Sequence, residues 1–195
     1  MNLPNKLTIL RIILVPLFII AMLVDFPLHF LVAGLIFAIA CITDTLDGKI
    51  ARSRNLVTDF GKFADPLADK ILVISALVCF LQVGLLGNFG AVPITIILFR
   101  EFAVSGIRLV AASSGKVVAA NIWGKVKTVT QMVGIVIILV AQAFLEVMKL
   151  LSINIGIPDV VFLYTGIGLI WISTIFTIVS GIIYIKDNIG FIKNC

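Results

Sequence analysis

Charge is what this sequence most lacks. Only 13% of its 195 residues are Asp, Glu, Lys or Arg, whereas 61% are hydrophobic. An average soluble domain is about 25% charged, so this balance excludes an ordinary globular domain. Because apolar runs of roughly 20 residues, the length that crosses a bilayer, recur along the whole chain, the sequence predicts an integral membrane protein.

Cysteine and histidine are also scarce, which excludes several kinds of site. The three cysteines form no disulfide framework and no zinc pattern, and Cys41 and Cys79 fall inside apolar runs, where a free cysteine behaves as a small hydrophobe. The single histidine, His29, stands near the end of a predicted span, and we expect it to be interfacial. No repeat, low-complexity tract or linker interrupts the chain, so we expect one membrane domain over residues 1–195.

Hydropathy predicts an all-α integral membrane protein with six transmembrane helices. The first apolar run is too long for a signal peptide and lacks a small-residue cleavage site, so it is expected to be a retained span. The predicted spans are Leu7–Val24, Phe30–Ala51, Leu67–Leu86, Val92–Ala112, Val126–Phe144 and Val160–Ile185.

The placement of Lys and Arg predicts the orientation. With both termini in the cytoplasm, Lys149 is the one basic residue near the outer connections, as the positive-inside rule requires. We therefore expect a multi-pass protein of the cell membrane. Its net charge of +5 lies mostly on the cytoplasmic side and would attract anionic lipids or phosphate-bearing substrates. Because the basic residues punctuate apolar helices and form no exposed stripe, we expect no nucleic-acid partner.

Two pairs of aspartates at helical spacing break the apolar pattern, in the stretch DTLDGKIARSRNLVTDFGKFADPLADK at residues 44–70. The first pair ends the second predicted span and the second pair begins the third, so all four acids meet at one cytoplasmic end. On a helix, Asp44 and Asp47 share a face with Gly48 and Ala51, whose small side chains leave room for a flat group beside Arg52. The four acids are Asp44, Asp47, Asp65 and Asp69.

Four carboxylates at membrane depth repel one another and need a compensating cation. Oxygen ligands without His or Cys favour Mg²⁺ or Mn²⁺. Two such ions held by four aspartates would make a diphosphate site suited to in-line displacement. The position of Pro66 leaves the local geometry open, because it could either begin the third helix or kink a helix that starts near Thr58.

Other interpretations of the acids are weaker. They could pair with neighbouring lysines and arginines in a solvated loop, but that would not explain four acids at helical spacing on two helices. An EF-hand is excluded because the acids follow DxxDG and no glutamate closes the loop. A cation or proton transporter also buries carboxylates, but such acids usually lie near the bilayer midplane. A non-catalytic scaffold would leave the glycine and alanine spacing unexplained.

The stretch resembles the CDP-alcohol phosphatidyltransferase family. It matches the family signature D-x2-D-G-x2-A-R-x8-G-x3-D-x3-D at every fixed position, from Asp44 to Asp69. The resemblance implies transfer of a phosphatidyl group from CDP-diacylglycerol to an alcohol, with release of CMP. It also implies that the four aspartates hold two divalent metals and that Asp69 is the general base. The implied nucleotide-binding residues are Asp47, Gly48, Ala51, Arg52 and Gly61.

A second region, REFAVSGIRLVAASSGKVVAANIWGKVKTVTQ at residues 100–131, concerns the acceptor. So much positive charge favours an anionic acceptor, although Arg100 could simply pair with Glu101 and Lys116 could be an ordinary positive-inside loop residue. Together with the opening NLPNKLTILR, this region resembles the phosphatidylglycerophosphate synthase subfamily. That resemblance implies sn-glycerol 3-phosphate as acceptor, although serine, inositol phosphate and phosphatidylglycerol stay open as alternatives. The candidate acceptor-phosphate ligands are Arg108, Lys125, Lys127, Arg100 and Lys116.

The same resemblance carries two further expectations. The opening segment would be a short juxtamembrane helix, although a plain interfacial anchor accounts for it equally well. The protein would be a homodimer embedded among membrane lipids, but no single stretch of the sequence reports on the dimer interface.

Overall fold

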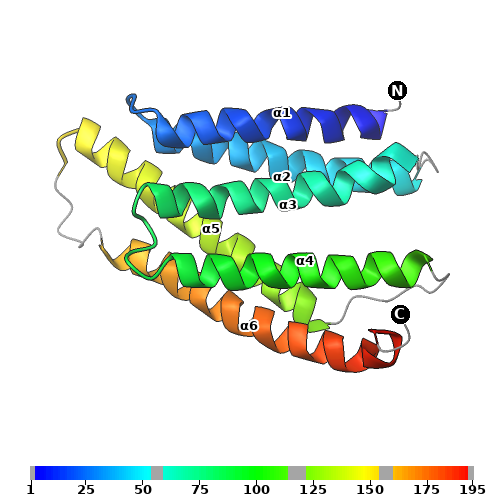
Figure 1. Cartoon of the computed structure of the whole chain (residues 1–195). Coiled ribbons are helices and arrows are strands. Elements are labelled where there is room, and N and C mark those ends of the chain that lie inside the picture. Colours follow the sequence, from blue (N-terminus) through cyan, green and yellow to red (C-terminus); the bar gives the residue numbers. More distant parts are fainter. Residues whose placement is uncertain (1–2, 54–58, 114–121, 154–159, 193–195) are drawn as a thin grey trace. The chain divides into compact units, whose positions relative to one another are not determined.

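The computed structural model describes residues 3–53, 59–113, 122–153 and 160–192, which form six helices and no strand (Figure 1). The predicted all-α fold is confirmed, and each predicted span corresponds to one helix. The helices are α1 (Leu3–Leu23), α2 (His29–Ser53), α3 (Asp59–Gln82), α4 (Ala91–Ser113), α5 (Ile122–Leu150) and α6 (Val160–Ile192).

Four of the described helices contain stretches long and apolar enough to cross a membrane. The apolar part of α3, Lys70–Gln82, is shorter. Large apolar side chains such as Ile13, Leu17 and Ile20 lie exposed on α1, as expected of a helix that contacts lipid. The protein is therefore a membrane protein. The qualifying stretches are Asn5–Leu23, His29–Leu46, Ile122–Leu150 and Leu163–Asp187.

Tertiary contacts divide the chain into two compact units. Unit 1 comprises residues 1–85 and 138–163, and therefore α1, α2, α3 and the second half of α5. Unit 2 comprises residues 86–137 and 164–195, and therefore α4, the first half of α5 and most of α6. The expectation that the chain is one domain stays a prediction.

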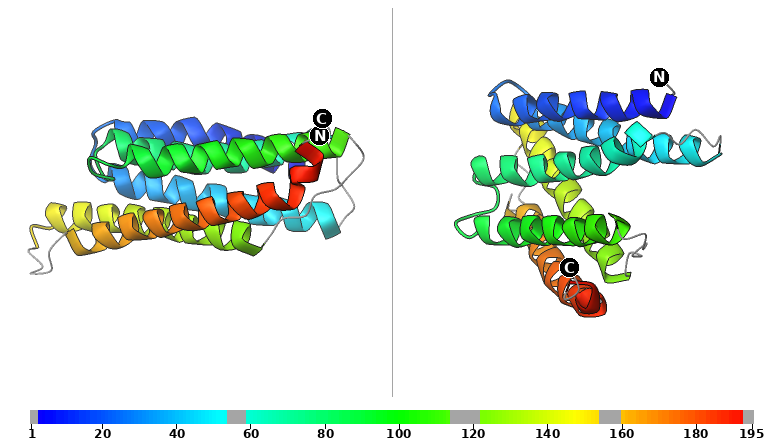
Figure 2. Two further views of the ribbon diagram at one scale, coloured as in Figure 1. Left: turned by 60° about the horizontal axis from the view of Figure 1, so that its bottom comes forward. Right: turned by 45° about the vertical axis from the view of Figure 1, so that its right-hand side comes forward.

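In unit 1, α1 packs against both α2 and α3, and the two views of Figure 2 show these helices running alongside one another. The deeper part of the interface is apolar, with the rings of Phe18 and Phe37 5.8 Å apart. Towards its N-terminus the same face of α1 becomes polar, because Asn5, Thr8 and Arg11 are all buried. The opening segment is continuous with α1, so the described chain has no separate juxtamembrane helix before the first span.

The start of α2 is capped by a residue from α5 in the same unit. The carboxylate Oε2 of Glu146 accepts hydrogen bonds from the backbone N–H groups of Phe30, at 2.8 Å, and Leu31, at 3.4 Å. These N–H groups belong to the first turn of α2 and have no acceptor within the helix. The other oxygen of Glu146 lies 3.4 Å from Nε2 of His29, so His29 has a specific partner as well as a place at a helix end.

Helix α3 begins at Asp59, which decides between the two geometries left open for Pro66. Because the helix is already formed before residue 66, Pro66 lies inside α3 and does not begin it.

Candidate active site

Both halves of the aspartate signature lie on helices of unit 1. Helix α2 continues to Ser53 and therefore includes the positions from Asp44 to Arg52, and α3 includes those from Gly61 to Asp69. The helical spacing on which the metal-site prediction depends is thus present in the backbone of both helices. Asp44 and Gly61 are described with their surroundings, whereas the side chains of the other signature residues lie outside the described part of the structure. Those residues are Asp47, Gly48, Ala51, Arg52, Asp65 and Asp69.

Asp44 is held from the neighbouring helix. Its Oδ1 lies 2.6 Å from a terminal guanidinium nitrogen, Nη1, of Arg11 on α1. Next to it, Thr43 is buried and donates its hydroxyl to the backbone carbonyl of Ala40 at 2.7 Å, as a side chain commonly does inside a helix. The first acid of the signature therefore has a fixed cationic partner within the protein.

The donor atoms that the signature supplies fit a hard divalent cation. All four acids offer carboxylate oxygens, and the side chain of Asp44 is partly exposed. The described residues contain no group of three or more His, Cys, Asp or Glu arranged around a common point. Three of the four aspartate side chains lie outside that part of the chain, so the metal site stays a prediction.

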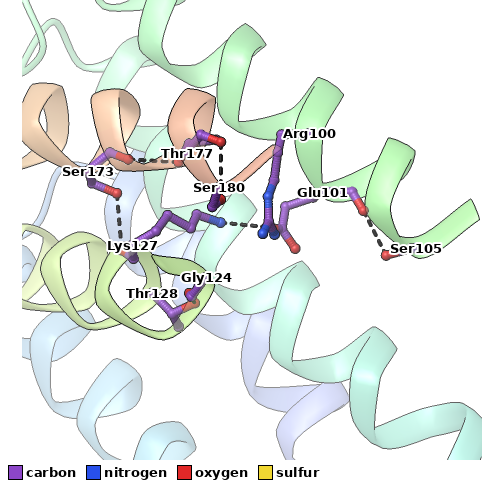
Figure 3. A network of polar contacts seen from close by, with 9 residues as sticks. All are labelled: Arg100, Glu101, Ser105, Gly124, Lys127, Thr128, Ser173, Thr177 and Ser180. Atoms are coloured by element: carbon purple, nitrogen blue, oxygen red, sulfur yellow. Dashed lines mark hydrogen bonds and ion pairs between the residues drawn. The ribbon is translucent and has the colours of Figure 1, made fainter. Parts of the chain in front are cut away.

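The second predicted region forms an ion-paired network in unit 2 (Figure 3). Oε1 of Glu101 on α4 accepts hydrogen bonds from Nζ of Lys127 on α5, at 2.5 Å, and from Nη1 of Arg100, at 3.1 Å. Lys127 is only 4% exposed. The pairing of Arg100 with Glu101 that the sequence suggested is therefore present, and the same carboxylate also holds Lys127.

Helix α6 lines this network with buried hydroxyl groups. Ser173 donates to the backbone carbonyl of Lys127 at 3.2 Å, which ties α6 to α5. Thr177 donates to the carbonyl of Ser173 at 2.7 Å, and Ser180 donates to that of Thr177 at 3.2 Å. Gln131, one turn beyond Lys127 on α5, is also buried. The interior of unit 2 is thus polar over several helical turns, an arrangement that is costly in a membrane protein unless its groups are paired or have a function.

The remaining predicted acceptor ligands differ in their surroundings. Lys125 is exposed on α5, two residues before Lys127. Arg108 is also exposed, and its guanidinium carbon lies 5.7 Å from the ring centre of Tyr184 on α6, within cation–π distance. Lys116 lies outside the described residues. Arg108 and Lys125 therefore present charge at the surface of unit 2, whereas Lys127 and Arg100 are engaged by Glu101.

Sequence reasoning missed three residues with clear structural roles: Arg11, Glu101 as the shared partner of two cations, and Glu146. Each acts on a residue of another helix, and neither hydropathy nor helical periodicity reports such pairings. A signal for Arg11 was available, because Thr8 and Arg11 are polar residues three apart inside the first predicted span and so lie on one face of the helix.

Comparison with known proteins agrees with these features. The family model for CDP-alcohol phosphatidyltransferase matches residues 1–179. A relative from Bacillus subtilis (strain 168), named CDP-diacylglycerol–glycerol-3-phosphate 3-phosphatidyltransferase, is 42% identical over 96% of this chain and 95% of its own length. A relative of the same name from Rickettsia bellii (strain RML369-C) is 37% identical over 95% of this chain and 94% of its own length. The probable phosphatidylglycerophosphate synthase of Mycobacterium tuberculosis (strain ATCC 25618 / H37Rv) is 42% identical over 69% of this chain and 64% of its own length.

Three observations agree on the family of this chain. The family model matches most of the chain, the aspartate signature is complete, and the described structure is an all-helical membrane architecture. The chain belongs to the CDP-alcohol phosphatidyltransferase family.

Proposed function

We propose that the protein transfers the phosphatidyl group of CDP-diacylglycerol to sn-glycerol 3-phosphate, which yields phosphatidylglycerophosphate and CMP. The observation that carries this proposal is the 42% identity over nearly the whole chain with the Bacillus subtilis relative, whose name states this reaction. The complete signature from Asp44 to Asp69 supports the donor half of the reaction, and the cationic side chains of unit 2 support an anionic acceptor.

The four signature aspartates would hold the divalent ions. Mg²⁺ or Mn²⁺, when bound, supplies positive charge to the diphosphate of the donor and to the leaving CMP. Gly48, Ala51 and Gly61 would leave space for the nucleotide, because none of them has a side chain larger than a methyl group. Arg52 would add a cation beside the nucleotide.

Asp69 would take the proton of the acceptor hydroxyl as the general base. The hydroxyl oxygen then forms a bond to the phosphorus that carries the diacylglycerol, and the bond from that phosphorus to the bridging oxygen of CMP breaks. The proton ends on the Asp69 carboxylate, and CMP leaves with the electron pair of the broken bond.

For the acceptor phosphate we propose Lys125 and Arg108 as direct ligands, because both are exposed cations. Lys127 and Arg100 share one carboxylate, so with Glu101 they contribute one net positive charge to the same region. Lys116 stays a candidate on the basis of its charge alone. The basic groups would favour a phosphorylated acceptor over a neutral one.

We further propose that the protein lies in the cell membrane as a homodimer, with its active site and both termini in the cytoplasm. The distribution of Lys and Arg supports this orientation through the positive-inside rule. The dimer rests on the family resemblance.

The test is a CMP-release assay with purified protein in detergent, CDP-diacylglycerol, Mg²⁺ and one acceptor at a time. We expect release with glycerol 3-phosphate and much less with serine, inositol phosphate or phosphatidylglycerol. Preferred turnover of another acceptor would overturn the acceptor assignment. Absence of CMP release with every acceptor and metal would overturn the reaction. Metal-dependent cation uptake into proteoliposomes without lipid turnover would instead indicate a transporter.

A further inference from the structure

Arg11 is a buried charge in the apolar first helix. Its side chain is 0% exposed, whereas three residues on other faces of α1, Leu10, Ile12 and Ile13, are exposed. A guanidinium does not lose its proton in proteins, so Arg11 brings a permanent positive charge into the interior of unit 1. Such a charge is tolerated only where an anion or several hydrogen-bond acceptors compensate it, and here an aspartate of the metal signature does so.

The pair formed by Arg11 and Asp44 is unequal in exposure. The arginine is fully enclosed, but the Asp44 side chain keeps 46% of its surface exposed. Oδ1 of Asp44 lies 2.6 Å from Nη1 of the buried guanidinium, while nearly half of the Asp44 side-chain surface stays exposed. The Asp44 side chain is therefore paired with a buried cation and is at the same time accessible from outside.

We infer that Arg11 is a positioning residue for the donor site: it holds Oδ1 of Asp44 so that the other carboxylate oxygen can bind the divalent cation that this site takes, with or without the donor. This inference rests on the proposed function. Residues that orient metal ligands without touching the metal typically change metal affinity by 10-fold to 100-fold when they are replaced. Arg11 would act on the metal in that way, through Asp44.

The chemistry of arginine suits this role better than that of lysine. The contact joins one guanidinium nitrogen, Nη1, to one oxygen, Oδ1, so Arg11 acts on Asp44 as a nearby positive charge. A guanidinium is planar and more weakly hydrated than an ammonium group, which makes it the better cation for a fully buried position. Arg11 also offsets part of the repulsion among the four signature acids before any metal binds. Asn5 and Thr8 on α1 are buried as well, so Arg11 is one of three buried polar side chains in this part of the helix.

The test compares Arg11→Met and Arg11→Lys with the wild-type protein and with Lys6→Gln, which removes an exposed cation from the same helix. The first readout is the affinity for Mn²⁺, measured by electron paramagnetic resonance of unbound Mn²⁺ in the absence of any lipid donor. The second readout is the Mg²⁺ concentration that gives half-maximal CMP release.

We expect Arg11→Met to weaken Mn²⁺ binding by about 10-fold to 100-fold and to raise the half-maximal Mg²⁺ concentration by a similar factor. Arg11→Lys keeps the charge and should weaken binding less, and Lys6→Gln should match the wild type. In an Asp44→Asn background, replacing Arg11 should change Mn²⁺ affinity little, because the group it positions is already altered.

Should Arg11→Met fail to yield monodisperse protein, Arg11→Lys carries the test, because it keeps a cation in the buried site. Wild-type affinity for Mn²⁺ in a folded Arg11→Lys or Arg11→Met variant would overturn the inference. The Mn²⁺ measurement needs no turnover, so it is separate from the proposed function. A protein that binds Mn²⁺ but releases no CMP would overturn the function, whereas a normal enzyme with unchanged variants would overturn the role of Arg11.

Discussion

The carboxylate of Glu101 faces two cations, so the three members of this network should contribute unequally to stability. In Glu101→Gln, Lys127 and Arg100 would face a neutral amide, and Lys127 is only 4% exposed. Removing one partner of a buried ion pair typically costs about 3–5 kcal/mol. In Lys127→Met, Glu101 keeps Arg100 as a partner, and methionine approximates the length of the lysine stem. We therefore expect a smaller cost of about 1–2 kcal/mol, in the range of one lost charged hydrogen bond.

The double variant Glu101→Gln/Lys127→Met measures the energetic coupling between Glu101 and Lys127. Once Glu101 is neutral, replacing Lys127 by methionine removes a buried cation that has lost its carboxylate. The double variant should therefore be more stable than Glu101→Gln alone, and the coupling energy should be about 2–3 kcal/mol. Lys125→Met, on the exposed side of the same helix, is the control and should change stability by less than about 0.5 kcal/mol.

The assay is reversible unfolding in mixed micelles by titration with SDS, followed by far-UV circular dichroism. The reasoning would be refuted if Lys127→Met destabilised the protein as much as Glu101→Gln, or if the two effects simply added. CMP release from the same variants separates stability from function. Lys125→Met should raise the KM for glycerol 3-phosphate without loss of stability, whereas Lys127→Met should affect both.

Three further predictions concern other parts of the molecule. Asp69→Asn should abolish CMP release while the protein still binds CDP-diacylglycerol, measured by retention of labelled donor; near-normal turnover would show that another group is the base. Glu146→Gln should lower the free energy of unfolding by about 1–3 kcal/mol, because the side chain that caps the first turn of α2 loses its charge. An unchanged free energy of unfolding in the SDS titration would contradict this role of Glu146. Gly134→Ala should destabilise by about 1–3 kcal/mol, because its new methyl group would lie 3.3 Å from the backbone oxygen of Gly166 and 3.0 Å from the side chain of Ile170. The matched Gly106→Ala meets nothing within 4 Å and should leave stability unchanged or raise it by up to about 1 kcal/mol in the same titration, because alanine favours a helix more than glycine does.

Hydropathy predicted the number and order of the helices because each apolar run is long and continuous. It placed the start of α1 at Leu7, whereas the helix begins at Leu3. The difference arises because Asn5 and Lys6 lower the local hydropathy, although Asn5 is buried in the structure. Hydropathy also ended the fifth span at Phe144, whereas α5 continues to Leu150. The prediction ended early because the charge of Glu146 interrupts the apolar run.

The aspartate signature could be located from spacing alone, because its residues are close in sequence and lie on two consecutive helices. The environment of Lys127 could not. In the sequence, Lys127 resembles any other lysine near the cytoplasmic end of a span. Its partner Glu101 is 26 residues away on another helix. Burial and the shared carboxylate depend on how α4, α5 and α6 pack, which is a property of tertiary structure. The pairing of Arg11 with Asp44 was hidden for the same reason.

Helix α2 is held at its first turn and again past its middle by side chains from different helices of unit 1. Glu146 binds the amides of its first turn, and Arg11 binds Asp44, about 21 Å further along the axis at 1.5 Å per residue. The helix cannot roll about its axis or slide lengthwise without breaking one of these attachments. These two attachments restrain Asp44 relative to α1, and we expect it to move less than the segments that admit the lipid donor and release CMP.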